Sequence, residues 1–333
     1  MCVSMEFSDN FEYLCRLMKT IYLKKRPEEV PDSVATIGVF DGVHLGHQLV
    51  IGKVLEQARQ RGLASTVITF DRQPRQVLDP SFRPQLLTTL EEKAEIIASL
   101  GVSQLVVLPF TREMASLSAW DFMQQVLTDQ LHVKVLFTGY DNRFGHDRTE
   151  GFDDYVRYGG QLGMQVLRGD VELMDGGSQA VSSSVIRRLL AEDGRVDLMP
   201  RYLTRRYALK GRVMAGEHIG HRLGYPTANL ELEDAGKLIP AAGVYAVWVV
   251  LEGEQSPRAA MMNIGMRPTF DGHRQTLEVN ILGFDGNLYG QTVQVAFVER
   301  LRDERKFDSP EALKAQLEQD RVRVNELLRL NNK

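Results

Sequence analysis

The sequence predicts a two-domain protein, with a doubly wound parallel α/β sheet followed by an antiparallel β-barrel and a C-terminal helix. Three observations support this fold class. A chain of 333 residues is too long for one ordinary core, so it favours two domains. Strand and helix patterns alternate through the first part of the chain. After Asp193-Gly194, strand-like runs follow one another without intervening helices.

The elements of the first domain are short apolar runs separated by helix-period segments. We expect these runs to be parallel strands buried on both faces, with ligands at their carboxyl ends. A first strand begins at Lys19-Thr20-Ile21-Tyr22. The other strands are expected at Ala35–Phe40, Ser65–Phe70, Leu105–Leu108, Lys134–Thr138 and Met164–Leu167, and the helices at 46–61, 89–100, 117–130, 151–162 and 183–192.

The second domain follows a short linker that contains Pro200. Its strand-like runs are separated by turn signals such as Asp271-Gly272 and Asp285-Gly286, which is typical of an antiparallel barrel. We place the two domains at 18–192 and 203–333. The barrel strands are expected at Tyr207–Val213, Gly243–Leu251, Arg258–Ile264, Thr276–Gly283 and Gln291–Val298, and a closing helix at Pro310–Leu330.

Composition argues against several classes of protein. The 43% hydrophobic and 25% charged residues indicate a soluble globular protein, and no apolar run approaches the roughly 18 residues of a membrane span. A net charge of −4 argues against a general nucleic-acid binder. Cys2 and Cys15 form no disulfide or zinc pattern, and no secretory signal is recognisable. We expect a cytoplasmic protein whose ordinary start is Met18, with residues 1–17 as an extension.

A glycine-rich segment, Gly38-Val39-Phe40-Asp41-Gly42-Val43-His44-Leu45-Gly46-His47, follows an apolar strand and opens a helix. Such a turn presents free backbone N–H groups and the positive end of a helix dipole, which suits a phosphate. His44 and His47 are three residues apart, so both imidazoles can face one anion. A lone histidine is more often structural, but this pair in this setting favours phosphate chemistry.

A second motif, Val181-Ser182-Ser183-Ser184-Val185-Ile186-Arg187, opens the expected helix 183–192. Its serines can cap that helix, and Arg187 lies one turn further on. A serine N-cap by itself is common and needs no ligand. Combined with the histidine pair, the motif predicts a second phosphate-binding group, because a guanidinium is always charged and its N–H donors can bind two oxygens at once.

The second domain contains a tetrapeptide, Pro226-Thr227-Ala228-Asn229, after glycines at 211, 216, 220 and 224. A threonine hydroxyl and an asparagine carbonyl are hard oxygen donors that suit Mg²⁺. A β-turn that contains proline would explain the same four residues equally well. No Gly-x4-Gly-Lys-Ser/Thr motif is present, which excludes a P-loop kinase. Thr276, Glu278 and Asn280 share one face of a predicted strand. This pattern indicates either a solvated opening or cavity of the barrel or simply a half-exposed strand.

The first-domain motifs resemble the nucleotidyltransferase superfamily, and in detail the adenylyltransferase half of bacterial bifunctional riboflavin kinase/FMN adenylyltransferases. Ser184 stands where that family has Thr and keeps the hydroxyl, and Gly139–Gly145 resembles its Asp-Phe-Arg-Phe-Gly loop. The resemblance implies a Rossmann-like nucleotidyltransferase domain with His44 and His47 as catalytic residues. It also implies ATP or flavin contacts from Gly38, Phe40, Asp41, Gly46, Asp141, Ser183, Ser184 and Arg187.

Two departures from the family pattern fall in this first half. Gln73 occupies the position where the family usually has His, and Asn142 the position where it usually has Phe. Glutamine can hydrogen-bond a nucleotide but cannot carry positive charge. If a cation is needed at this position, the adenylylation reaction is weakened.

The second half resembles riboflavin kinase. Glu278 matches that family's glutamate, which is implied to accept the proton of the ribityl 5′-hydroxyl as it attacks the γ-phosphate of ATP. Thr227 and Asn229 are implied to contact Mg²⁺ and ATP phosphates. Asn280 stands where the family often has His, and we expect activity to survive this change. Further ATP or flavin contacts are implied for Gly211, Gly224 and Arg302, although Arg302 could equally belong to a solvated helix lead-in.

We therefore expect an enzyme that makes FMN and then FAD, using ATP twice with Mg²⁺. Its partners are expected to be ATP, riboflavin and FMN, with no nucleic acid and no membrane, and the chain is expected to be a monomer or a weak homo-oligomer. One alternative is a riboflavin kinase whose first domain has lost adenylylation through Gln73 and Asn142. Another is a flavin-binding regulatory or storage protein, which Glu278 disfavours because binding alone needs no general base.

Overall fold

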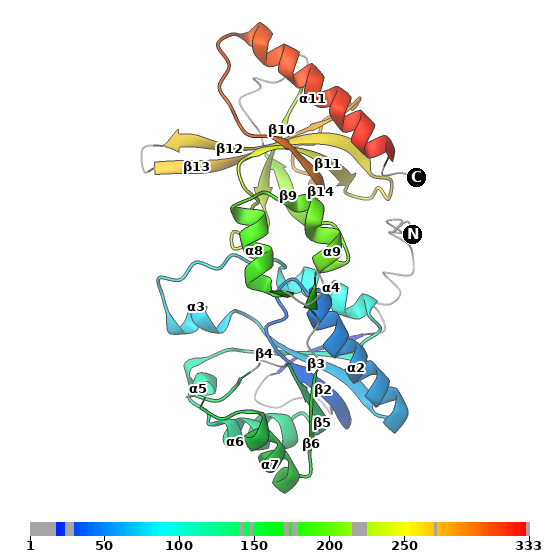
Figure 1. Ribbon diagram of the computed structural model, residues 1–333, viewed down its shortest axis with the longest axis vertical. Helices are drawn as coiled ribbons and strands as arrows, with labels where there is room; N and C mark the ends of the chain where they lie inside the picture. The colour runs from blue at the N-terminus through cyan, green and yellow to red at the C-terminus, as the bar shows by residue number, and fades with distance from the viewer. Residues whose placement is uncertain are drawn as a thin grey trace. The chain divides into compact units, whose positions relative to one another are not determined.

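The computed structural model describes residues 18–23, 30–139, 143–146, 149–169, 173–174, 179–214, 225–269 and 272–330. These residues form two compact units, of which the first ends at Ser183 and the second begins at Ser184 (Figure 1). The domain limits that we expected, 192 and 203, lie within the second unit and stay a prediction.

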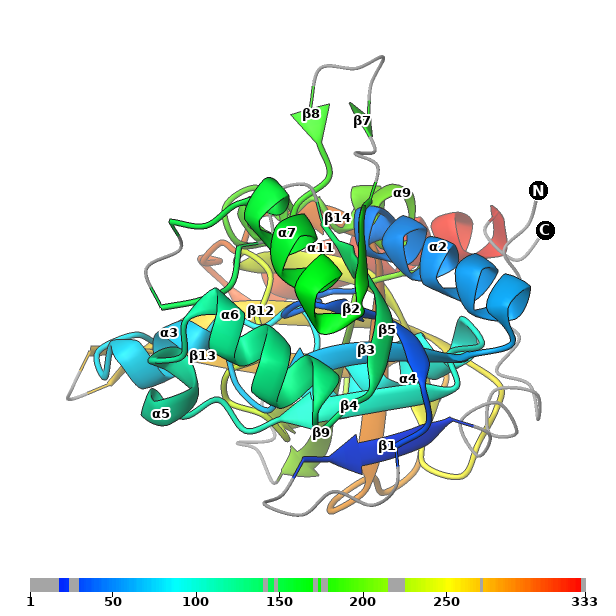
Figure 2. The same cartoon turned by 90° about the horizontal axis from the view of Figure 1, so that it is seen from below.

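The first unit is built on a six-stranded sheet with the order β1-β4-β3-β2-β5-β6 (Figure 2). Every neighbouring pair is parallel, which confirms the predicted sheet. The short apolar segments form these strands because both of their faces are covered by helices. The strands are β1 (Lys19–Tyr22), β2 (Ser33–Ile37), β3 (Ala64–Phe70), β4 (Gln104–Leu108), β5 (Val133–Thr138) and β6 (Gln165–Arg168).

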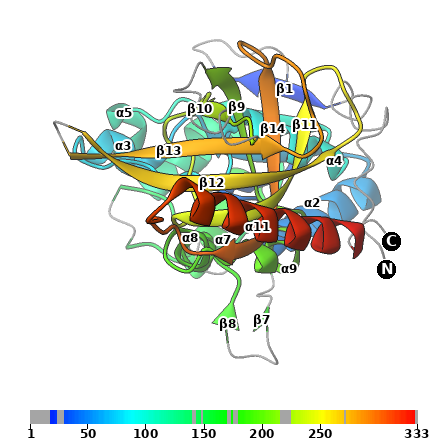
Figure 3. The same cartoon turned by 90° about the horizontal axis from the view of Figure 1, so that it is seen from above.

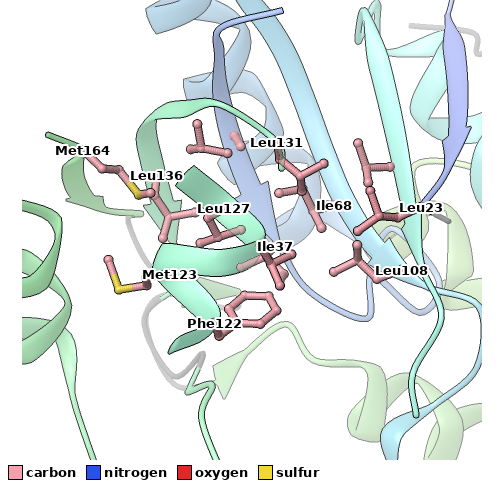
Figure 4. Close-up of a cluster of buried hydrophobic side chains, with 14 of the residues drawn as sticks. Leu23, Ile37, Ile68, Leu108, Phe122, Met123, Leu127, Leu131, Leu136 and Met164 are labelled. Carbon is pink, nitrogen blue, oxygen red and sulfur yellow. The ribbon is translucent and has the colours of Figure 1, made fainter. Parts of the chain in front are cut away.

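Alternate strand residues enter separate cores on the two faces of the sheet. On one face, Ile37, Ile68 and Leu108 pack with Phe122 and Leu127 (Figure 4). The opposite face is covered by α2 and α4, through clusters that include Val54 and Ile97. The helices and small elements are α2 (Leu45–Arg61), α3 (Pro74–Leu78), α4 (Leu90–Ser99), α5 (Arg112–Ala115), α6 (Ala119–Asp121), the π-helix η1 (Phe122–Thr128), α7 (Phe152–Leu162), β7 (Leu173–Met174) and β8 (Gln179–Ala180).

Two elements of this unit differ from the prediction. Strand β2 ends at Ile37 rather than Phe40, because Phe40 adopts a φ of 48° that an extended strand does not allow. The expected helix 117–130 begins as α6 and continues as a π-helix from Phe122 to Thr128. The apolar period across 117–130 marks a buried helical face but does not reveal how tightly the turns are wound.

The topology identifies where this sheet is suited to bind a ligand. Strand β2 pairs with β3 on one side and with β5 on the other, so the order of the strands reverses at β2. In open α/β sheets the crevice outside the carboxyl ends of the strands at such a reversal is the usual ligand site. The segment 38–44, which joins β2 to α2, begins at this point.

The second unit is a closed six-stranded antiparallel barrel with the order β10-β13-β12-β11-β14-β9. The predicted antiparallel barrel is confirmed, but one strand, β10, was missed. Because only Leu230 of β10 is buried, this strand has no continuous apolar run from which it could be predicted. The barrel strands are β9 (Ala208–Met214), β10 (Ala228–Leu232), β11 (Gly243–Leu251), β12 (Arg258–Thr269), β13 (Gly272–Ile281) and β14 (Thr292–Arg302).

Residues of the barrel strands alternate between its interior and its outer face. Tyr245 and Val247 of β11 point inward and are fully buried. Trp248 and Met261 lie on the outer face, where they pack with Val324 of the long helix α11 (Pro310–Leu330; Figure 3). The unit also contains α8 (Ser183–Ala191), the 3₁₀ helix η2 (Val196–Leu198) and α9 (Met199–Leu203).

Candidate active sites

The turn between β2 and α2 has an unusual backbone. Phe40, Gly42 and Val43 have φ values of 48°, 82° and 39°. Positive φ is strained for a β-branched residue such as Val43, and strain of this kind is typical of functional sites. His44 is the N-cap of α2, and its Nδ1 accepts a long hydrogen bond of 3.4 Å from the backbone N–H of His47.

The two histidines of this turn lie face to face. The rings of His44 and His47 are stacked with centroids 3.6 Å apart, and the ring of Phe40 meets His47 edge-on at 5.1 Å. Gly46 leaves room for this stack, because a Cβ there would lie 3.3 Å from the His44 ring. Burial lowers the pKa of His47 well below its usual value, and the nearby His44 and Lys93 lower it further. The structure thus provides a neutral imidazole at a helix N-terminus.

Asp41 holds the turn in place from within the protein. Its buried carboxylate accepts hydrogen bonds from the backbone N–H groups of Leu87 (2.9 Å) and Thr88 (3.1 Å). The Thr88 hydroxyl in turn accepts one from the N–H of Gly42 at 3.0 Å. These contacts assign Asp41 a positioning part in the described structure. The direct ATP or flavin contact that we expected of it stays a prediction.

One contact joins the two motifs that the sequence singled out. The hydroxyl of Ser183 donates to the backbone carbonyl of Asp41 at 2.9 Å, across 142 positions of sequence. Ser184 and Arg187 lie further along α8, beyond the end of the first unit. The structure therefore links the serine motif to the histidine turn through Ser183. The expected site residue Asp141, like Asn142, lies outside the described residues.

Two further residues in this half have roles that the structure makes clear. The backbone N–H of Gly38 donates to the carbonyl of Ile68 at 3.0 Å, and a Cβ on Gly38 would lie 3.2 Å from the Phe40 ring. The absence of a side chain at Gly38 therefore leaves room for the ring of Phe40. Gln73 is the N-cap of the short helix α3, where its backbone N–H donates to the side chain of Gln76 at 2.8 Å.

In the second unit, strand register aligns the predicted residues on the outer face of the barrel. Asn229 of β10 pairs with Glu278 of β13, and Glu278 pairs with Asn263 of β12. Asn263 continues the row to Val244 of β11, which pairs with Arg302 of β14. Paired residues of neighbouring strands share a face, so a carboxylate lies between two amides. The sequence reasoning left Asn263 out of the site, and only the register reveals it.

A pocket of about 500 Å³ opens at the start of β10, and its lining does not include Asn229, Glu278 or Asn263. It is enclosed by the start of β10, by interior residues of β13 and by the loop before β14, and its lining includes Thr227, Val279 and Tyr289. The segment that carries Thr227 is held firmly, because the buried amide of Asn280 donates to the carbonyl of Pro226 at 2.7 Å. Asn280, which the sequence analysis placed on the same strand face as Glu278, thus supports this site through Pro226.

Tyr225 ties the same segment to the C-terminal helix. Its hydroxyl donates to Glu318 of α11 at 2.8 Å, and Glu318 also pairs with Arg321. These two hydrogen bonds lower the pKa of Glu318 to about 2, with the Arg321 bond contributing most. The start of β10 is therefore anchored on both sides.

Arg302 forms an ion pair in the described structure, and the ATP or flavin contact that we expected of it stays a prediction. Its guanidinium forms a two-pronged pair with Asp320 of α11, at 3.0 and 2.8 Å to the same carboxylate oxygen, and both side chains are largely buried. Gly211 lies inside β9, where a Cβ would lie 2.9 Å from Leu230, so packing requires a glycine there, and its expected ATP or flavin contact stays a prediction. Gly224 lies outside the described residues.

No group of three or more histidine, cysteine, aspartate or glutamate residues capable of holding a metal ion occurs among the described residues. Within the same part of the chain, no helix is long and apolar enough to cross a membrane. Thr227 and Asn229 supply neutral oxygen donors instead. Such donors suit Mg²⁺ that stays partly hydrated and is carried by a substrate's phosphates.

These two sites define a two-domain transferase that handles nucleotide phosphates. An FAD synthetase family model matches residues 26–185, and a riboflavin kinase family model matches residues 203–328. The chain thus carries both domains that the motifs predicted.

The relatives of the chain agree over nearly its full length. It is 36% identical over 316 residues to the bifunctional riboflavin kinase/FMN adenylyltransferase of Escherichia coli strain K12, covering 95% of this chain and 98% of that one. It is 39% identical over 296 residues to the Pseudomonas fluorescens enzyme of that name, covering 89% and 92%. The chain belongs to the bifunctional riboflavin kinase/FMN adenylyltransferase family, which confirms the resemblance and the enzyme class predicted from the motifs.

A solved structure supports the arrangement of both units' elements. A crystal structure described as a macrolide-efflux protein from Streptococcus pneumoniae has a TM-score of 0.84 and 32% sequence identity to this chain. The match covers 92% of this chain and 99% of that one.

Proposed function

We propose that this protein phosphorylates riboflavin to FMN in its second unit and adenylylates FMN to FAD in its first. Each unit supports the proposal with its own reacting groups, namely Glu278 between Asn229 and Asn263 in the barrel and the His44–His47 stack at a helix N-terminus. The aligned row of Asn229, Glu278 and Asn263 is the observation that carries it. A protein that only binds a flavin has no need of a carboxylate between two amides.

In the kinase reaction Glu278 acts as the general base. It accepts the proton of the ribityl 5′-hydroxyl while that oxygen attacks the γ-phosphorus of ATP, and ADP leaves. Asn229 and Asn263 flank Glu278 in the strand register. These neutral neighbours can orient the carboxylate without supplying a charge that would make it a weaker base. The pocket next to Thr227 is the proposed place of the nucleotide.

Thr227 and Asn229 are the residues that would hold Mg²⁺ with the ATP phosphates. Both offer hard, neutral oxygens, and their positions two residues apart on one segment put them on the same side of the chain. When bound, the cation would neutralise charge on the triphosphate. Asn280 and Tyr225 keep this segment in place through Pro226 and Glu318.

In the adenylyl transfer, a phosphate oxygen of FMN attacks the α-phosphorus of ATP in line, and pyrophosphate leaves. Catalysis rests on position and on charge stabilisation, so no covalent enzyme intermediate is required. His44 and His47 are proposed to hold the phosphates together with the N-terminus of α2. Ser183, Ser184 and Arg187 are proposed to grip the triphosphate from the second motif.

The competing proposal is a riboflavin kinase with an inactive first unit, and Gln73 is the reason to consider it. Incubation of the protein with FMN, ATP and Mg²⁺ separates the two. Formation of FAD and pyrophosphate in equal amounts supports the bifunctional proposal. If a folded protein converts riboflavin to FMN but yields neither FAD nor pyrophosphate, the kinase-only function is correct.

The proposal also covers where and with what the enzyme works. We place it in the cytoplasm, where its cosubstrate ATP is made, with ATP, riboflavin and FMN as its small-molecule partners. A monomer or weak homo-oligomer is proposed because each set of reacting groups named above lies within one chain. Light scattering over a range of protein concentrations tests this, and a stable higher oligomer at every concentration would contradict it.

A further inference from the structure

Lys93 is a buried lysine directly behind the histidine turn. It belongs to α4, and its side chain is 6% exposed. Its ammonium donates to the carbonyl of Val39 at 2.7 Å and to the hydroxyl of Thr69 at 3.3 Å. The Thr69 hydroxyl itself donates to the same Val39 carbonyl at 3.2 Å. One buried cation therefore joins the turn after β2 to the end of β3.

The charged and titratable groups around Lys93 come from the turn itself. Asp41 favours its charged form, whereas burial opposes it and lowers the pKa of Lys93 to about 8. Burial lowers the pKa of His47 most, the neighbouring His44 lowers it further, and the positive charge of Lys93 adds a smaller contribution. A buried cation without a full counter-ion is costly, and its retention next to a phosphate-binding turn points to a function.

We propose that Lys93 is a positioning residue for adenylyl transfer, which fixes the Val39 carbonyl behind the histidine turn. This inference rests on the proposed adenylyltransferase function of the first unit. The hydrogen bond to Val39 anchors the residue that precedes the strained stretch Phe40–Val43. Without it, the turn loses this hydrogen bond to α4.

The charge of Lys93 has a separate consequence for His47. A protonated His47 would stack against His44 beside a second cation, which is unfavourable in a buried place. Burial is the main reason that the pKa of His47 is lowered, and the charge of Lys93 adds to the effects of burial and His44. Loss of the cation would let His47 take up a proton at higher pH.

The first test compares two variants with a matched control. Lys93→Met removes both the charge and the hydrogen bonds, and Lys93→Gln removes the charge but keeps a donor. We expect kcat/KM for FAD formation to fall roughly a hundredfold in Lys93→Met and less in Lys93→Gln, as for other groups that place reacting atoms. Lys53→Met is the control, because Lys53 is exposed on α2, where it pairs with Glu56 of the same helix. FMN formation by the same proteins reports that the chain is folded.

The second test measures the effect of the Lys93 charge on the pKa of His47 and does not rely on activity. The pKa of His47 is measured by NMR titration of ¹⁵N-histidine-labelled protein, with His47→Gln to assign the signal. We expect both Lys93 variants to raise the pKa of His47, and the acid limb of the FAD-formation profile to move to higher pH with it. An unchanged pKa of His47 together with an unchanged profile in Lys93→Gln overturns the inference. Absence of FAD formation in the wild type would contradict the proposed function, not the titration.

Discussion

The two sites of this protein are built in opposite ways. In the first unit, the turn that carries the chemistry is held by hydrogen bonds to three distant segments. The carboxylate of Asp41 accepts from the backbone N–H groups of Leu87 and Thr88. Lys93 donates to the carbonyl of Val39, and Ser183 donates to the carbonyl of Asp41. In the second unit, the backbone ladder of the barrel alone puts Asn229, Glu278 and Asn263 in one row.

This difference predicts how substitutions at each site should affect its activity. A side chain on a barrel strand can be exchanged without moving its neighbours, since the main-chain hydrogen bonds of the ladder set its position. The histidine turn has no ladder, and its positive φ values persist only while surrounding contacts enforce them. Substitutions in the second site should therefore remove chemistry alone, whereas substitutions around the first should also loosen the turn.

The largest effect is expected for Glu278→Gln. This change keeps the shape of the side chain but removes the general base, so FMN formation should fall roughly a hundredfold to ten-thousandfold. FAD formation from added FMN should stay within about twofold of wild type, because the first unit has its own reacting groups. Both rates are measured by product chromatography. FMN formation that survives unchanged would remove Glu278 from the kinase mechanism.

His47→Ala tests the other side of the comparison. Loss of one phosphate-binding imidazole should lower FAD formation about a hundredfold or more. FMN formation from riboflavin should be preserved, provided the two units act independently. The same chromatographic assay measures both reactions. A parallel loss of both activities would show that the histidine turn also supports the barrel site, and the separation argued above would be wrong.

Arg302→Met distinguishes the expected ligand contact from the observed ion pair. The substitution leaves Asp320, which is 4% exposed, without its guanidinium, and should lower the free energy of unfolding by about 3 kcal/mol. Trp248 reports unfolding of the second unit, and Arg323→Met, at an exposed pair with Glu299, is the control. A variant as stable as wild type but with a much higher KM for riboflavin would instead make Arg302 a substrate residue.

The smallest effect is a difference in how the two units respond to acid. Burial lowers the pKa of His47 in the folded state, so the unfolded chain binds a proton first as the pH falls below about 6.5. The stability that neutral His47 contributes is therefore present above pH 6.5 and is lost as the pH falls toward its folded pKa. For Glu318, the contribution is present above about pH 4.5 and is lost as the pH falls toward 2.

The two tryptophans make this difference measurable, because Trp120 lies in the first unit and Trp248 in the second. Urea unfolding of the Trp248→Phe and Trp120→Phe variants at pH 5 to 8 follows each unit. Between pH 6.5 and 5 the unit with Trp120 should lose stability, and His47→Gln should reduce that loss. Equal pH slopes in both units would contradict the predicted difference.

Much of this architecture is readable from the sequence because it depends on local pattern. The parallel strands are apolar runs, and the histidine turn is a contiguous motif. Strand β10 and Asn263 were missed because local pattern does not reveal them: the first has no continuous apolar run, and the second gains meaning only from cross-strand register. Likewise, no local pattern reveals that Asp41 accepts from Leu87 or that Lys93 reaches Val39.

The central claim is that one chain makes FAD from riboflavin in two separable steps. Product analysis with riboflavin, ATP and Mg²⁺, resolving FMN from FAD over time, tests it most directly. FMN should appear first and then decline as FAD accumulates with an equal amount of pyrophosphate. A time course that stops at FMN, with no FAD from a fully folded protein, would contradict the account.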